Sequence, residues 1–340
     1  MKKAYFGVLI VLLLLFVAGF MERSGMTKRE PMPSDISSQE NSEGGFIHVN
    51  TETAIVDEIN HPAFQGFGRF LFPTEHEMPD KEMRLNEIDL LLPYHNNINS
   101  DTTVNVLNHM MDEVKGGETI FYDYYTESQK QDEPDKGNTG LFFFRGEPNA
   151  PFAIICPGGG FSYVGSIHEG FPHALELSKK GYNAFVIQYR VGGADIACKD
   201  LAAAISYIFE NAESLRVGTK YYSVWGSSAG ARMAAYIGSY GTVAFGGADL
   251  PKPSTVIMAY TGHSDYTTDD PPTFAVVGER DGIANPSIMQ RRINALKSAG
   301  INTEYHEYPN LGHGFGLGIG TSAEGWLNDA VQFWEKQMSD

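Results

Sequence analysis

Short apolar runs alternate with longer segments of helical apolar spacing from about Thr119 to the end of the chain. Strands are predicted at Thr119–Tyr125, Leu141–Arg145, Phe152–Cys156, Asn183–Tyr189, Tyr221–Trp225, Thr255–Tyr260, Thr273–Val277 and Thr303–Tyr308. Helices are predicted at Phe171–Lys180, Ile196–Phe209, directly after Gly230, at Ser287–Ala299 and at Ala323–Gln337, and a charged turn is predicted around Gln129–Asn138, between the first two strands. Strands that alternate with helices form a mostly parallel sheet with helices on both faces, so the pattern predicts the α/β class and one large domain over 118–340.

The first twenty residues have the pattern of a targeting segment. Lys2 and Lys3 precede an uncharged apolar run, Ala4–Phe20. A basic head followed by an apolar core is typical of a signal peptide, but the run is also near the minimum length of a membrane anchor. We therefore expect residues 1–20 to be a signal peptide or an N-terminal anchor, and the rest to be secreted or membrane-anchored outside the cytoplasm. Residues 21–45 are polar and are predicted to be a disordered linker.

Residues 46–117 form an N-terminal extension without a recognisable motif. An aromatic cluster comprises Phe64, Phe67, Phe70, Leu71 and Phe72. A helix is predicted from Asp101, as its N-cap, to Gly116. Two roles stay open for this segment, a lid over the functional site and the cover of a sheet edge.

Composition excludes several classes of function. The formal net charge is −17, which disfavours nucleic acid and anionic membrane surfaces as partners. The two cysteines, Cys156 and Cys198, lack a CxxC spacing and are predicted to be buried thiols, which excludes a disulfide scaffold. The chain has no HExxH motif and no dinucleotide fingerprint after its first strand, so neither a metal nor a cofactor is predicted. The oligomeric state is left open.

Candidate chemistry begins at Gly226-Ser227-Ser228-Ala229-Gly230. An apolar strand precedes this GxSxG pattern and a helix rich in small residues follows it. A serine exposed on such a sharp turn needs strained backbone angles, and glycines on either side remove side chains that would clash. The context predicts Ser228 as a nucleophile.

A serine hydroxyl needs a base, and the base needs an acid to orient it. His313 lies in a glycine-rich loop after the last strand and is the predicted base, because the order serine, acid, histidine disfavours the earlier His168 and His173. Asp281, after the strand Thr273–Val277, is the predicted acid. Other candidate acids are Glu279, Asp265, Asp269 and Asp270.

Three glycines follow the strand Phe152–Cys156 in the sequence Pro157-Gly158-Gly159-Gly160-Phe161. Residues without side chains let backbone amides approach a substrate closely, as an oxyanion hole requires. The amide of Ala229, directly after Ser228, is the other predicted donor.

The motifs PGGGF, GSSAG, GERDG and LGHGFG, in this order, resemble those of α/β-hydrolase esterases, in particular the small bacterial esterases with acetyl-xylan-esterase-like and feruloyl-esterase-like members. The resemblance extends from about Thr119 to the C-terminus. It implies a carboxylic-ester hydrolase with Ser228 as nucleophile, Asp281 as acid and His313 as base. Gly159, Gly160 and Ala229 are the implied oxyanion contributors. Pro157, where the hormone-sensitive-lipase-like branch has His, and residues 46–117 depart from the pattern.

A carboxylesterase for small-molecule or carbohydrate esters with short acyl groups is the main hypothesis. The connection between the strands Thr255–Tyr260 and Thr273–Val277 is too short for a large cap, which favours an open pocket. Two alternatives remain: a peptidase of the same fold and a catalytically silent hydrolase-fold binding protein.

Overall fold

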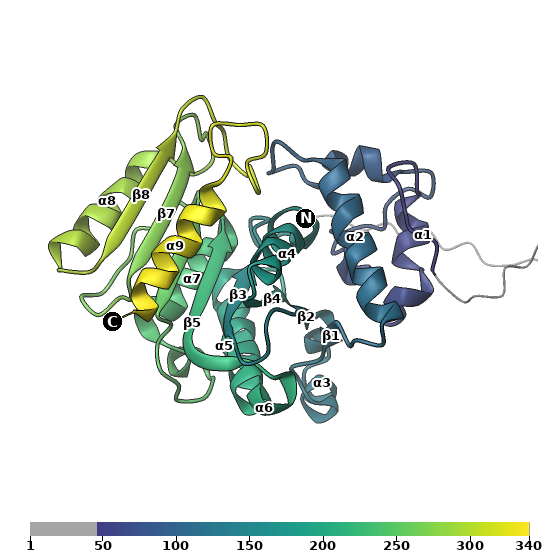
Figure 1. Ribbon diagram of the computed structural model, residues 1–340, viewed down its shortest axis with the longest axis horizontal. Helices are drawn as coiled ribbons and strands as arrows, with labels where there is room; N and C mark the ends of the chain where they lie inside the picture. Colours follow the sequence, from purple (N-terminus) through teal and green to yellow (C-terminus); the bar gives the residue numbers. More distant parts are fainter. Residues whose placement is uncertain (1–45, 340) are drawn as a thin grey trace, which may run out of the picture. The chain divides into compact units, whose positions relative to one another are not determined.

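The structure is a computed structural model, and it describes residues 46–339 (Figure 1). The predicted signal peptide or anchor at 1–20 and the predicted linker at 21–45 lie outside these residues. In the described part of the chain, no helix combines the length and the apolar character that a bilayer span requires.

Eight strands form one sheet in the order β1-β2-β4-β3-β5-β6-β7-β8. The strands are β1 (Phe121–Tyr122), β2 (Gly140–Phe144), β3 (Pro151–Cys156), β4 (Asn183–Gln188), β5 (Gly218–Ser227), β6 (Thr255–Ala259), β7 (Thr273–Gly278) and β8 (Thr303–Tyr308). All pairs from β4 to β8 are parallel, whereas β1 and β2 are antiparallel to their neighbours. The prediction of a mostly parallel sheet is confirmed.

Helices cover both faces of this sheet (Figure 1). The helices are α3 (Glu127–Asp132), α4 (Phe171–Lys179), α5 (Ala194–Glu210), α6 (Ala212–Leu215), α7 (Ala229–Tyr240), α8 (Pro286–Ser298) and α9 (Trp326–Met338). Helices α4 and α9 lie on the face toward which Trp225 points, and its ring is 6.5 Å from that of Trp326 and 6.3 Å from that of Trp334. Helices α5 and α7 pack on each other and on the opposite face, while α8 contacts β7 and β8.

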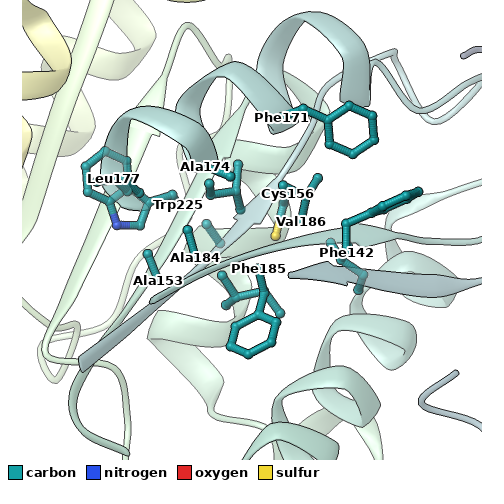
Figure 2. Packing of buried hydrophobic residues seen from close by; sticks show 14 of the residues in the cluster. Phe142, Ala153, Cys156, Phe171, Ala174, Leu177, Ala184, Phe185, Val186 and Trp225 are labelled. Carbon is teal, nitrogen blue, oxygen red and sulfur yellow. The ribbon is translucent and has the colours of Figure 1, made fainter. Parts of the chain in front are cut away.

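The core lies between the sheet and these helices. Figure 2 shows Phe171, Ala174 and Leu177 of α4 over the central strands. The strands β2, β4, β6 and β7 are buried along their whole length, which explains their largely apolar sequences, because strands with both faces covered have no solvent side. Cys156 and Cys198 are free and buried, as predicted.

The N-terminal segment 46–117 is built from two helices and short 3₁₀ turns. The helices are α1 (Ile55–Ile59) and α2 (Ser100–Lys115), and the turns are Pro62–Phe64, Gly68–Phe70 and Leu85–Leu91. Helix α2 contacts α4 (Figure 1), and the ring of Phe67 stacks on that of Phe121 in β1 at 4.8 Å. Burial of each aromatic ring contributes roughly 1.5–3 kcal/mol. The aromatic cluster therefore holds the segment against the β1–β2 end of the sheet.

Two local predictions were wrong. The N-cap of α2 is Asn99, whose side chain accepts from the Thr102 amide at 3.0 Å, and Asp101 lies in the first turn instead. The segment predicted as a charged turn after the first strand is helical, because Thr126 and Gln129 cap each other's backbone amides at the start of α3.

Candidate active site

Ser228 occupies the sharp turn between β5 and α7. Its backbone has φ 51° and ψ −115°, and its amide donates to the carbonyl of Ala259 on β6 at 2.9 Å. A Cβ on Gly230 would lie 1.8 Å from the carbonyl oxygen of Cys156, so only glycine permits α7 to pass this close to β3. The turn exposes the serine hydroxyl above the carboxyl ends of the central strands.

The structure brings Ser228, His313 and Asp281 together in a chain of hydrogen bonds. His313 Nε2 lies 2.8 Å from Ser228 Oγ, and its Nδ1 lies 2.7 Å from Asp281 Oδ2. A carboxylate only accepts, so Nδ1 carries the proton and Nε2 is left to accept from the hydroxyl. The other carboxylate oxygen, Oδ1, accepts from the amides of Ile283 and Ala284 at 2.9 and 2.7 Å. The arrangement can withdraw a proton from Ser228.

The other candidate acids lie in different interactions. Glu279 accepts from the Asn310 amide at 2.9 Å. Asp270 forms a buried ion pair with Arg292 at 2.7 Å. Asp269 pairs with Lys252 on the surface at 2.8 Å, and Asp265 is exposed.

His168 and His173, which precede Ser228 in the chain and are disfavoured as the base, are buried at or near α4. His168 Nε2 donates to the carbonyl of Gly314 at 3.0 Å, and the ring of His173 meets that of Trp326 edge to face. The pKa of each is lowered to about 4, chiefly because burial disfavours the charged imidazolium. Both rings are therefore neutral, and His168 supports the loop that carries His313.

These two histidines predict a loss of stability in mild acid. The pKa of an unfolded histidine is about 6.5, so between about pH 6.5 and 4 the unfolded chain binds more protons, and the free energy of unfolding falls as the pH falls. His168→Gln keeps a donor for Gly314 and removes one titrating group. We expect its unfolding free energy, measured with denaturant from pH 7 to 4, to depend less on pH by up to about 1.4 kcal/mol per unit. If the unfolding free energy of His168→Gln depended on pH as steeply as that of wild type, His168 would not be the buried, neutral group that we infer.

The predicted oxyanion residues surround the serine only in part. The glycine loop follows β3 and turns at Gly159 and Gly160, which have φ 130° and 64°. Gly160 and Ala229 line the same cavity as Ser228, whereas Gly159 is not among its lining residues. In the described chain the amides of Gly160 and Ala229 have no backbone acceptor, so both can donate to a bound oxygen.

The cavity at Ser228 has a volume of about 380 Å³. Its lining residues are Gly160, Phe161, Ser228, Ala229, Arg232, Tyr260, Thr261, Gly262, His263, Ser264, Asp265, Ile283, Ala284 and His313. Among residues 46–339 the lining thus comes from the glycine loop and the segments that follow β5, β6, β7 and β8. The lid role of the N-terminal segment stays a prediction.

Four further residues next to the site had not been predicted: Tyr260, Glu169, His95 and Asn96. Glu169 lies in a π-helical turn, Ser166–Gly170, directly before α4, a type of local geometry that is frequent at functional sites. Its position between two large apolar residues, Ile167 and Phe171, was the available signal. His95 and Asn96 belong to the N-terminal segment, and no local pattern links them to the site.

A mostly parallel sheet with a serine on the turn after β5, an acid after β7 and a histidine after β8 defines the class of α/β hydrolases. Comparisons with known proteins agree. Residues 145–250 match the model of the family described as BD-FAE. The acetylxylan esterase of Xylanibacter ruminicola is 22% identical over 236 residues, which cover 60% of this chain and 49% of that protein. The chain thus spans about half the length of this curated relative.

Solved structures show the same fold. An acetyl ester-xyloside bifunctional hydrolase from Caldicellulosiruptor lactoaceticus matches with a TM-score of 0.55 and 21% identity, covering 64% of this chain and 95% of that one. A carboxylesterase from Lactobacillus plantarum matches with a TM-score of 0.51 and 20% identity, covering 58% and 92%. The chain has the α/β-hydrolase fold and is related in sequence to an acetylxylan esterase.

Proposed function

We propose that this protein is a serine carboxylesterase that cleaves esters of short acyl groups, including acetylated carbohydrates. The observation that carries the proposal is the hydrogen-bonded chain Ser228–His313–Asp281 at an open cavity lined by Gly160 and Ala229. The relationship to esterases supports ester hydrolysis over the other reactions of this fold.

The reaction proceeds in two halves. Ser228 Oγ attacks the carbonyl carbon while His313 Nε2 takes its proton, and the carbonyl electrons move onto the oxygen, which accepts from the amides of Gly160 and Ala229. The bond to the alcohol then breaks, and His313 gives the proton to the leaving oxygen. Water repeats the sequence on the acyl-enzyme and releases the acid. Asp281 orients the imidazole and stabilises its charged form.

The wall of the cavity favours ester substrates with a small acyl group and an extended alcohol. The connection between β6 and β7 comprises only residues 260–272 and forms one side of the cavity. Arg292 anchors this connection through an ion pair with Asp270 at 2.7 Å and a hydrogen bond to the carbonyl of Asp265. A connection so short and anchored cannot close over the substrate as a cap, so the alcohol can continue into solvent.

A fluorophosphonate probe and a substrate panel test the proposal together. We expect the probe to label Ser228, and p-nitrophenyl acetate to be hydrolysed at a kcat/KM at least about tenfold above that of the octanoate, because the cavity is small. Acetylated xylo-oligosaccharides should release acetate. Turnover of peptide anilides but not of esters would indicate a peptidase. An unlabelled Ser228 without turnover would indicate a silent binding protein.

A further inference from the structure

Beneath the glycine loop lies a buried carboxylate that the reaction above does not use. Glu169 Oε2 accepts from the amide of Gly158 at 2.7 Å and lies 3.1 Å from His95 Nε2. Its other oxygen, Oε1, accepts from the Tyr260 hydroxyl at 2.7 Å. The side chains of Glu169 and His95 are 0% and 1% exposed, so this charge has no contact with solvent.

Each partner of Glu169 belongs to a different part of the active site. A Cβ on Gly158 would lie 2.9 Å from Ser228 Cβ, so the amide that Glu169 holds is directly beside the serine. The ring of Tyr260 lies 5.1 Å from that of His313, and its hydroxyl accepts from the Gly316 amide at 3.3 Å. The carboxylate therefore joins the glycine loop to the loop of His313.

His95 connects this network to the N-terminal segment. Its Nδ1 lies 2.9 Å from the Tyr163 hydroxyl, which also accepts from the Tyr94 amide at 3.2 Å. The next residue, Asn96, donates from its side chain to the carbonyl of His313 at 2.9 Å, and from its amide to Gly314 at 2.9 Å.

The absence of a side chain at Gly314 allows residues 94–96 to pack against the loop of His313. A Cβ there would lie 2.7 Å from the Cα of His95. Residues 94–96 thus bind the glycine loop on one side and the His313 loop on the other.

The electrostatics favour the ionised form of Glu169. Burial alone would raise the pKa of Glu169, but the adjacent His95 and the Tyr260 hydrogen bond hold this pKa below its usual range. Burial raises the pKa of Tyr260 well above 10, so its hydroxyl remains a donor. A buried carboxylate with three partners from different segments is held rigidly, and losing one of them leaves its charge less well compensated.

We propose that His95, Glu169 and Tyr260 are positioning residues that fix the glycine loop relative to Ser228 and His313. Through His95, the N-terminal segment then contributes to catalysis. The inference rests on the proposed esterase function. Small displacements of the loop would weaken donation to the developing oxyanion more than binding of the neutral ester, because the charge appears only in the transition state.

Glu169→Gln and His95→Gln test the inference. Gln at 169 keeps the shape but has one accepting oxygen instead of two, so the Gly158 amide, His95 and the Tyr260 hydroxyl can no longer all donate to it. We expect each variant to lower kcat for p-nitrophenyl acetate by about 10- to 100-fold with KM changed less than about threefold. Binding of a trifluoromethyl ketone, whose adduct carries the oxyanion, should weaken by the same factor as kcat/KM. Tyr260→Phe, which keeps the ring, should produce a smaller loss in the same two measurements.

Asn108→Ala is the matched control for stability. Among residues 46–339 its side chain bonds only to the backbone of Val49, so the substitution loosens the N-terminal segment without touching the site. We expect a lower Tm with kcat unchanged. Folded Glu169 and His95 variants with kcat and ketone affinity within about twofold of wild type would overturn the inference. An Asn108→Ala variant that lost as much kcat as the Glu169 and His95 variants would also overturn the inference. A wild-type chain that the fluorophosphonate does not label overturns the proposed function as well.

Discussion

Replacing Ser228 with Ala should lower kcat for an acetyl ester by at least about 10⁴-fold and leave the fold intact. The substitution removes only the hydroxyl that lies 2.8 Å from His313 Nε2. The backbone at 228 stays as strained as before, because Ala has the same Cβ. Steady-state kinetics, with circular dichroism and Tm for the fold, measure the effect.

Ser227→Ala is the control for this substitution. Ser227 precedes the nucleophile and is buried, with 2% of its surface exposed. Its loss should reduce kcat far less than that of Ser228, by about tenfold at most. A folded Ser228→Ala protein that retained most of its turnover would place the nucleophile elsewhere.

Asp281→Asn should cost about 10⁴-fold in kcat with little effect on Tm. The amide can still accept from Ile283 and Ala284 through its oxygen, as Asp281 Oδ1 does at 2.9 and 2.7 Å. Its nitrogen would then face His313 Nδ1 as a donor. The imidazole would take the other tautomer, with a proton on Nε2, and could no longer accept from Ser228.

Glu279→Gln removes the same charge from the same loop without touching His313. In the part of the chain that the structure describes, the Glu279 side chain accepts only from the backbone amide of Asn310, at 2.9 Å. We expect its kcat to stay within about twofold of wild type. Equal losses in the two variants would mean that the charge of the loop, rather than the contact with His313, governs the rate.

Much of the site could be predicted because its signals are local. The turn at Ser228 needs Gly230 for a close approach of two backbones, and this requirement is visible in the sequence itself. His313 and Asp281 follow adjacent parallel strands, whose carboxyl ends meet at one edge of the sheet. The positions of the two strand ends therefore predict that His313 and Asp281 lie near each other.

The remaining features depend on contacts that no local pattern encodes. Asn96 reaches the carbonyl of His313 across 217 positions of sequence, and neither residue's neighbours indicate the pairing. The start of α2 was missed for a different reason. Asn99 and Asp101 are both good caps, and the choice depends on whether the first turn begins after Asn99, which then accepts from the Thr102 amide, or two residues later.

The aromatic contacts of the N-terminal segment determine where this protein can be shortened. β1 is a two-residue edge strand, and its Phe121 stacks on Phe67 at 4.8 Å and on Phe70 at 5.6 Å. A truncated chain that began at Thr119 would lose Phe67 and Phe70 and would present the ring of Phe121 and an unprotected strand to solvent, a combination that promotes aggregation. The smallest soluble form for expression, crystallisation or fusion to other enzymes must therefore retain residues 46–117.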